Sequence, residues 1–196
     1  MTSIATHLDP LPEWNVSIWL NSRGPVTLES LRGKVVVIHT FQMLCPGCVS
    51  HGLPQAERIR QTFREEEVAV VGLHTVFEHH DVMTVDVLRA FILEYRWSFP
   101  IGVDRPADKG PVPKTMANYG LHGTPTLIVL DRHGVARLHH FGRIEDLPVG
   151  AHIGQLLAEG KRAANQGAFE SGETREGVAS VMACDADGCA VDRSAT

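Results

Sequence analysis

Two cysteines separated by two residues, Cys45 and Cys48, have the clearest capacity for chemistry in this chain of 196 residues. Such a pair can form a disulfide, exchange electrons with other thiols, or supply half of a zinc site. A zinc site of this kind needs a second ligand pair at similar spacing. The other cysteines, Cys184 and Cys189, have a different spacing and lie far along the chain. A redox-active dithiol is the better interpretation, with reduced core cysteines or half a zinc site as alternatives.

The neighbours of the pair favour Cys45 as the attacking sulfur. Pro46 follows it and is typical of the first position of a helix. Free amides and partial positive charge at a helix start favour the thiolate over the thiol. Cys48, one turn further on, would attack the mixed disulfide and release the product. Pro46 and Gly47 carry no positive charge, so we expect a moderate stabilisation of the thiolate.

A strand before the dithiol and a helix after it would hold the pair in place. Residues 35–41 are apolar and mostly β-branched, as in a central strand buried on both faces. One helical stripe follows, formed by Val49, Leu53, Ala56, Ile59 and Phe63. Pro54 lies within this stripe and predicts a kink. Residues 68–73 resemble a second buried strand, so the three elements predict a right-handed unit with parallel strands.

The remaining sequence predicts further strands and helices after a polar loop at 74–81. In order, they are a helix at 85–95 capped by Thr84, a strand at 101–103, a helix at 114–119, a hairpin of 126–130 and 135–141, and a helix beginning near Pro148. Residues 14–20 are mostly apolar and are expected to cover one end of the core. The pattern predicts an α/β domain with a central mixed sheet flanked by helices.

We expect three parts: an irregular lead-in at 1–13, one domain at 14–164, and a flexible, acidic tail at 165–196. Cys184 and Cys189 could face each other across a small hairpin in the tail and form a second dithiol that exchanges with Cys45. Two idle thiols in a disordered tail are the alternative.

The composition excludes several classes of partner. The net charge is −5, most of it in residues 165–196, so no basic face for nucleic acid or an anionic membrane is expected. No run approaches the roughly 18 apolar residues of a membrane span. The first residues lack the basic start and apolar core of a secretory signal, so we expect a cytoplasmic location.

The order of elements, together with Gly123-Thr124-Pro125-Thr126 before the hairpin, resembles the thioredoxin fold. Three further features are similar to the TlpA/DipZ-like thiol-disulfide oxidoreductases, relatives of the AhpC/TSA redoxin superfamily. They are Trp19-Leu20-Asn21, Leu31-Arg32-Gly33-Lys34-Val35-Val36, and the helix-bearing insertion between Leu73 and Ile101. The resemblance covers roughly residues 14–158 and implies an N-terminal extension before the conserved sheet elements of that fold.

The resemblance also implies roles for the Thr124-Pro125 pair. Proline cannot donate to a sheet ladder, which suits the first residue of a strand. In the thioredoxin fold the matching bond is cis and packs against the dithiol, so that the backbone of Thr124 meets an extended substrate. Pro46, Gly47, Thr124 and Pro125 are therefore the expected substrate-binding residues. An ordinary trans proline that opens a strand is the alternative.

Glu78 follows the second strand at the sheet edge where the dithiol is expected. A partly buried carboxylate there could accept the proton of Cys48, as in related proteins that have a Glu nearby. A solvated loop acid is the alternative, and His74 is a further candidate for proton transfer. His79, His80 and Asp81 are adjacent on a loop and are not expected to converge on a metal ion.

The leading hypothesis is a thiol-disulfide oxidoreductase that acts on protein or small-molecule disulfides with a thiol electron donor. It needs no cofactor or metal beyond the Cys45–Cys48 disulfide. A thiol peroxidase is the first alternative, although Ile38 and Gln42 occupy the Pro and Thr positions of the peroxiredoxin pattern Pro-x-x-x-Thr-x-x-Cys. A non-catalytic thioredoxin-like binding module is the second alternative.

Overall fold

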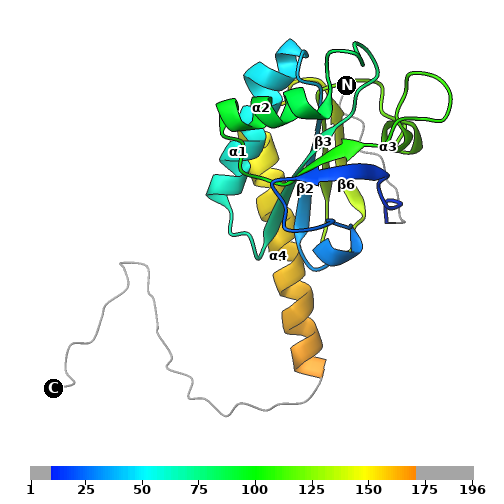
Figure 1. Ribbon diagram of the computed structural model, residues 1–196. Coiled ribbons are helices and arrows are strands. Elements are labelled where there is room, and N and C mark those ends of the chain that lie inside the picture. Colours follow the sequence, from blue (N-terminus) through cyan, green and yellow to red (C-terminus); the bar gives the residue numbers. More distant parts are fainter. Residues whose placement is uncertain (1–9, 171–196) are drawn as a thin grey trace, which may run out of the picture. The chain divides into compact units, whose positions relative to one another are not determined.

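The computed structural model describes residues 10–170, with the side chains of residues 10–160 (Figure 1). In chain order the elements are β1 (Val16–Leu20), the 3-10 turn η1 (Glu29–Leu31), β2 (Val35–Phe41), the π-helical turn η2 (Cys48–Gly52), α1 (Leu53–Thr62), β3 (Val68–His74), α2 (Val85–Tyr95), β4 (Ile101–Asp104), α3 (Lys114–Asn118), β5 (Thr126–Leu130), β6 (Ala136–Phe141) and α4 (Asp146–Glu170). The predicted order of helices and strands after residue 35 is confirmed.

The strands form one mixed sheet in the order β1-β4-β3-β2-β5-β6. β2 and β3 are parallel, in a register that runs from Val35 opposite Val68 to Phe41 opposite His74. β5 joins the other side of β2 in the antiparallel direction, and β6 pairs with β5. Every residue of β2 and β3 is buried. The carboxyl ends of both strands therefore meet at one edge, next to the C-x-x-C sequence.

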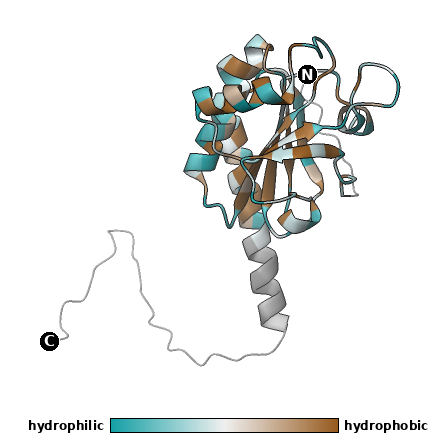
Figure 2. Ribbon diagram, viewed as in Figure 1, coloured by the Kyte–Doolittle hydropathy of each residue, from teal (hydrophilic) through white to brown (hydrophobic). Residues whose placement is uncertain are grey.

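Helices and loops cover both faces of this sheet, as predicted for the α/β class. Val35 and Val37 share one apolar cluster with buried residues of α1, α2 and the first half of α4. Val36 and Ile38 point to the opposite face, where they pack with residues of α3 and of the chain before β1. Figure 2 shows the resulting pattern, with hydrophobic strands in the centre and hydrophilic residues on the outer sides of the helices.

Residues 14–20 contain a strand that the sequence did not predict, whereas Trp14 and Leu20 of this segment are buried in the core, as expected. β1 forms the outer edge of the sheet and pairs antiparallel with β4. Val16 and Trp19 lie close to Gly102 of β4, where an added β-carbon would meet both side chains. An edge strand is buried on one side only, and its residues lack a regular alternation of apolar and polar types.

The helix after the dithiol also differs from the prediction. Instead of one helix kinked at Pro54, the chain forms the π turn η2 and then α1, with Pro54 in the first turn of α1. The amide of Leu53 donates to the carbonyl of Cys48, five residues back. Since Pro54 has no amide hydrogen to give to Ser50, the wider turn accommodates it at the junction.

The last helix begins at Asp146 and extends to Glu170, beyond the predicted domain end at residue 164. Ala163 and Ala164 favour continuation of the helix through residues 165–170. Cys184, Cys189 and the predicted hairpin around them lie outside the described residues. Over the described part of the chain, no helix combines the length and apolar character needed to cross a membrane.

Candidate active site

The dithiol lies where β2 ends and a helical turn begins. Cys45 precedes the first helical residue, Pro46, and its carbonyl accepts hydrogen bonds from the amides of Cys48 and Val49, both at 3.1 Å. The Sγ atoms of Cys45 and Cys48 are 2.6 Å apart, and both cysteines are free thiols. The predicted local arrangement is therefore present, with the two sulfurs close enough to react with each other.

The two sulfurs have different surroundings. Cys45 is half-buried and reachable from solvent, whereas Cys48 is fully buried. The amide of Cys48 donates to the Cys45 sulfur at 3.3 Å, which stabilises negative charge on that atom. Burial, followed by the hydrogen bond with Cys45, raises the pKa of the Cys48 thiol to about 12. Cys48 therefore keeps its proton at neutral pH, and Cys45 is the sulfur that a substrate can reach.

The loop before β5 completes one side of the dithiol. The thiol of Cys45 donates to the carbonyl of Thr124 at 3.5 Å, and the Thr124–Pro125 peptide bond is cis, the isomer that the resemblance implies. The ring of Pro125 packs against two glycines. A β-carbon added at Gly47 or at Gly52 would lie 3.3 Å from an atom of this ring. The predicted substrate-binding residues thus lie together around Cys45.

Glu78 does not have the surroundings predicted for it. Its carboxylate is exposed and accepts a hydrogen bond from the Gln42 side chain at 3.3 Å. The same Gln42 side chain accepts from the amide of Phe77 at 3.2 Å, so it holds the loop after β3. The expectation of a partly buried carboxylate is wrong, because this loop turns the run from Glu78 to Asp81 outward into solvent.

The predicted proton-transfer candidate His74 is buried at the end of β3. Its ring lies 5.2 Å from that of Phe41, and burial lowers its pKa to about 4. It is therefore neutral at physiological pH. The side chains of His79 and His80 are exposed, and no group of three His, Cys, Asp or Glu residues suited to a metal ion occurs within the described chain.

His39 is a buried residue near the site that the sequence analysis missed. It is 3% exposed, and neither ring nitrogen has a hydrogen-bond partner. Its Nδ1 atom would lie 3.5 Å from a β-carbon at Gly52, so the ring lies beneath the π turn that carries Cys48. Burial, strengthened by the nearby His51, lowers its pKa to about 3. A titratable residue within a strand of apolar neighbours was the signal available in the sequence.

Asp104, at the end of β4, is a second buried polar group, one residue beyond the strand predicted at 101–103. Its carboxylate accepts from the amides of Thr115 and Met116, at 2.8 and 3.0 Å, and from the hydroxyl of Thr75 at 3.0 Å. Burial raises its pKa, and these three donors oppose the shift. Asp104 therefore connects the start of α3 to the residue that follows β3.

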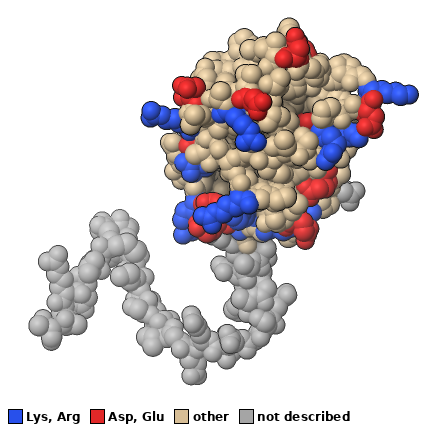
Figure 3. Space-filling view, in the orientation of Figure 1, with Lys and Arg blue, Asp and Glu red and all other residues tan. Residues whose placement is uncertain are grey.

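Two exposed apolar side chains lie near the dithiol. Leu44, next to Cys45, is 56% exposed, and Phe141, which would contact a β-carbon at Gly123, is 57% exposed. Elsewhere, Figure 3 shows positive and negative residues interspersed on the face in view, separated by uncharged surface. This face has no extended area of one sign of charge.

Comparison with known proteins identifies relatives with the same architecture. The AhpC/TSA family matches residues 8–139. The chain is 54% identical to a thioredoxin-like superfamily protein of known crystal structure, with a TM-score of 0.74, covering 76% of this chain and 96% of the other. It is 50% identical to a thiol-disulfide isomerase from Corynebacterium glutamicum, with a TM-score of 0.73 and the same coverage.

A curated relative, Protein DipZ of Mycobacterium bovis, is 28% identical over 145 residues, or 73% of this chain. The chain spans 20% of the length of DipZ. The family match covers most of the described residues and agrees with the similarity to the two solved structures at 54% and 50% identity. The chain belongs to the AhpC/TSA family and has a thioredoxin-like fold.

Proposed function

We propose that the protein is a thiol-disulfide oxidoreductase in which Cys45 and Cys48 carry the reaction. The observation that supports this most directly is the pair of sulfur atoms 2.6 Å apart, one accessible and one buried. The Thr124–Pro125 loop lies against the accessible sulfur. The similarity to a thiol-disulfide isomerase at 50% identity supports the same conclusion.

In the proposed reaction, the Cys45 thiolate attacks one sulfur of a substrate disulfide. A bond forms between Cys45 and that sulfur while the substrate S–S bond breaks, and the other substrate sulfur leaves as a thiolate. Cys48 then gives its proton to the substrate thiolate released in the first step and attacks the Cys45 sulfur. A bond forms between Cys48 and Cys45, the mixed disulfide breaks, and the second substrate sulfur leaves as a thiolate. The substrate gains two electrons, and the protein retains a Cys45–Cys48 disulfide that a thiol donor must reduce.

Burial of Cys48 separates the two steps. Because burial raises the pKa of Cys48 to about 12, this thiol does not compete with Cys45 for the first attack. The second step is intramolecular, and the distance of 2.6 Å between the two sulfur atoms favours a fast attack. The mixed disulfide is therefore short-lived in the unmodified protein.

The surroundings of Cys45 favour protein disulfides over small ones as substrates. The Thr124 backbone next to the sulfur offers hydrogen-bonding groups to an extended chain, and Leu44 and Phe141 offer exposed apolar contacts. In the cytoplasm predicted from the sequence, the reducing glutathione pool would drive the reaction towards reduction of such disulfides.

The test uses the two single cysteine variants in an insulin reduction assay with dithiothreitol. Cys45→Ser should lower the rate at least 100-fold, because the attacking sulfur is absent. Reduced Cys48→Ser, mixed with insulin after removal of dithiothreitol, should accumulate a mixed disulfide that survives non-reducing electrophoresis. Full activity of Cys45→Ser would overturn the proposal. A Cys184→Ser, Cys189→Ser double variant asks separately whether the predicted second dithiol takes part.

A thiol peroxidase is the competing hypothesis from the same family. Peroxiredoxins have a threonine three positions before the reactive cysteine. Gln42 occupies that position here, and its side chain forms hydrogen bonds with Glu78 and Phe77. We therefore expect slow consumption of hydrogen peroxide compared with insulin reduction. A peroxide-dependent oxidation of Cys45 faster than its reaction with insulin would reverse this order.

A further inference from the structure

A hollow lies at the opposite end of β3 from the dithiol. It has a volume of about 600 Å³, and one of its walls is the amino-terminal half of β3, Val68–Val71. The facing wall consists of residues 98–100, before β4, and residues 21–25, after β1. Since β3 runs from this hollow towards the dithiol, the two sites lie at opposite ends of the parallel strands. We refer to this hollow as the β3 groove.

The β3 groove exists because β4 pairs with only the last part of β3. The register begins with Gly72 opposite Ile101, and the Gly72 amide donates to the carbonyl of Pro100 at 2.9 Å. Pro100 itself has no amide hydrogen, so it cannot donate to a carbonyl further back along β3. Pairing therefore stops at this proline and leaves Val68–Val71 open on the β4 side.

The direction of the free backbone groups follows from the pairing with β2. The amide of Val35 donates to the carbonyl of Glu67 at 2.9 Å, so residues 67, 69 and 71 direct their backbone groups towards β2. The backbone groups of Val68 and Val70 point into the β3 groove instead. The Val68 amide is satisfied by the carbonyl of Arg64. Within the described chain, the Val70 amide and carbonyl have no backbone partner across the groove.

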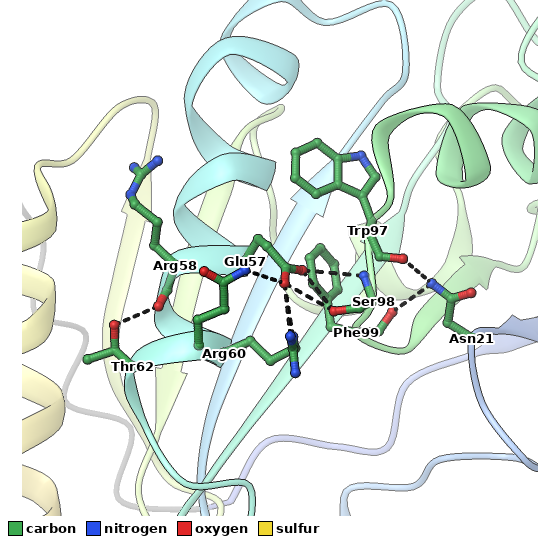
Figure 4. Close-up of polar contacts among 9 residues, drawn as sticks. Asn21, Glu57, Arg58, Arg60, Thr62, Trp97, Ser98 and Phe99 are labelled. Atoms are coloured by element: carbon green, nitrogen blue, oxygen red, sulfur yellow. Dashed lines mark hydrogen bonds and ion pairs between the residues drawn. The ribbon is translucent and has the colours of Figure 1, made fainter.

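The facing wall is fixed away from β3 by its own hydrogen bonds (Figure 4). The carboxylate of Glu57 accepts from the amide and hydroxyl of Ser98, at 3.3 and 3.1 Å. The side-chain amide of Asn21 donates to the carbonyls of Trp97, at 2.6 Å, and Phe99, at 3.4 Å. These polar groups are therefore already occupied and do not close onto β3.

The rim of the β3 groove is more positive than negative. Arg23, Lys34 and Arg60 line it together with one acid, Glu65. Arg60 pairs with Glu57, whereas neither Arg23 nor Lys34 forms an ion pair with any side chain that the structure describes. An occupant of the groove would therefore meet unpaired backbone groups at the wall and two uncompensated cations at the rim.

We propose that the β3 groove binds an extended acidic segment of a partner protein, which adds a short strand beside β3. Its backbone would accept from the Val70 amide and donate to the carbonyls of Val68 and Val70. Its acidic side chains would pair with Arg23 and Lys34. At about 3.3 Å per residue, the open stretch accepts a strand of roughly four residues. This proposal is independent of the dithiol reaction.

The first test measures amide hydrogen exchange by NMR in the full chain. Without a ligand, the Val70 amide should exchange at least tenfold faster than those of Ala69 and Val71, which face β2. The probe is a synthetic hexapeptide of alternating valine and glutamate. At saturation it should slow exchange at Val70 at least tenfold. No change at Val70, or an amide already protected in the free protein, would overturn the proposal.

Charge and backbone contributions are separated by variants of both partners. The double variant Arg23→Glu, Lys34→Glu should weaken binding of the hexapeptide at least tenfold, whereas Lys109→Glu, an unpaired lysine outside the groove, should change it less than twofold. A hexapeptide with alternate N-methylated amides should bind at least tenfold more weakly. Equal binding of the methylated peptide would contradict strand addition.

Two further outcomes would assign the groove to another ligand and so overturn the proposal. Inorganic phosphate that competes with the hexapeptide without protecting Val70 would indicate a simple anion site. Protection of Val70 that rises with protein concentration alone would indicate a second copy of this chain. Cys45→Ser should bind the hexapeptide as tightly as the unmodified protein, so failure of either proposal leaves the other intact.

Discussion

Pro125 packs so closely against Gly47 that a β-carbon added at position 47 would lie 3.3 Å from the Cδ atom of the proline ring. Gly52 has the same relationship to the Cβ atom of Pro125. The helical turn that carries the dithiol and the loop that faces it therefore fit together through the absence of two side chains. The position of the Thr124 carbonyl relative to the Cys45 sulfur depends on this fit.

Gly47→Val tests this contact. The branched side chain must displace Pro125, so we expect a loss of about 1–3 kcal/mol of unfolding free energy in urea. Insulin reduction should slow at least tenfold, because the Thr124 loop moves away from Cys45. Gly150→Val, at a helical position with no atom within 4 Å of an added β-carbon, serves as the control. Unchanged activity in Gly47→Val would show that the fit is not required.

The two thiols should differ strongly towards an alkylating reagent. Cys45 is half-buried, whereas Cys48 is fully buried and has a pKa raised to about 12. One equivalent of iodoacetamide at pH 7.5 should therefore label Cys45 at least 50 times more than Cys48. Peptide mass spectrometry distinguishes the sites, and labelling of both thiols in urea provides the control. Comparable labelling in the folded protein would contradict this assignment.

Acidification should destabilise the protein through two buried histidines. Burial lowers the pKa values of His39 and His74 to about 3 and about 4, below the unfolded value near 6.5. The unfolded chain therefore binds more protons, and stability that is complete above pH 6.5 is lost as the pH falls towards 3–4. At pH 5.5 the loss is about 1.4 kcal/mol for each histidine.

A double variant isolates this effect from that of the carboxylates. His39→Leu with His74→Leu should reduce the loss of unfolding free energy between pH 7.5 and 5.5 by about 3 kcal/mol. His133→Leu, at an exposed turn, should leave the loss unchanged. Urea titrations at both pH values measure the difference, and parallel curves for all variants would refute the prediction.

Asp104 should contribute to stability through the three hydrogen bonds that its carboxylate accepts. Asp104→Asn replaces one carboxylate oxygen by an amide group, which cannot accept from Met116 or Thr75. A buried donor without a partner costs about 1–3 kcal/mol, so the melting temperature should fall by several degrees. Asp108→Asn removes an exposed pair with Lys114 and should change stability by less than about 0.5 kcal/mol. Similar melting temperatures for both variants would rule out this role for Asp104.

The apolar rim of the dithiol should matter for large substrates alone. Leu44→Ser and Phe141→Ser remove exposed apolar surface without touching either sulfur. We expect the KM for insulin to rise three- to tenfold, while reduction of glutathione disulfide changes less than twofold. Leu93→Ser removes an exposed leucine from α2 and is the matched control. Equal effects on both substrates would argue against a protein-binding rim.

The sequence was most informative where one pattern dominates. The apolar run of β2 and the spacing of Cys45 and Cys48 predicted a buried strand leading into a dithiol turn, and the structure has both. The α/β class and the order of elements followed from similar runs. These features depend on neighbours in the chain, which is why they could be read without coordinates.

Features that depend on distant segments were harder to predict. Glu78 accepts a hydrogen bond from Gln42, 36 residues away, and β1 exists because β4 offers it a strand to pair with. His39 lies under the π turn through long-range packing with Gly52. No local pattern in the sequence encodes these contacts between distant residues, so they required the three-dimensional structure.

The early end of the pairing between β3 and β4 also bears on aggregation. An unpaired strand is normally a template on which identical chains stack without limit. Here Pro100 ends the β3 groove on one side. On the other side the groove ends at Val68, whose amide already donates to the carbonyl of Arg64. The strand proposed to bind here would lie between these two stops, and we expect them to disfavour growth of a continuous ladder of many molecules.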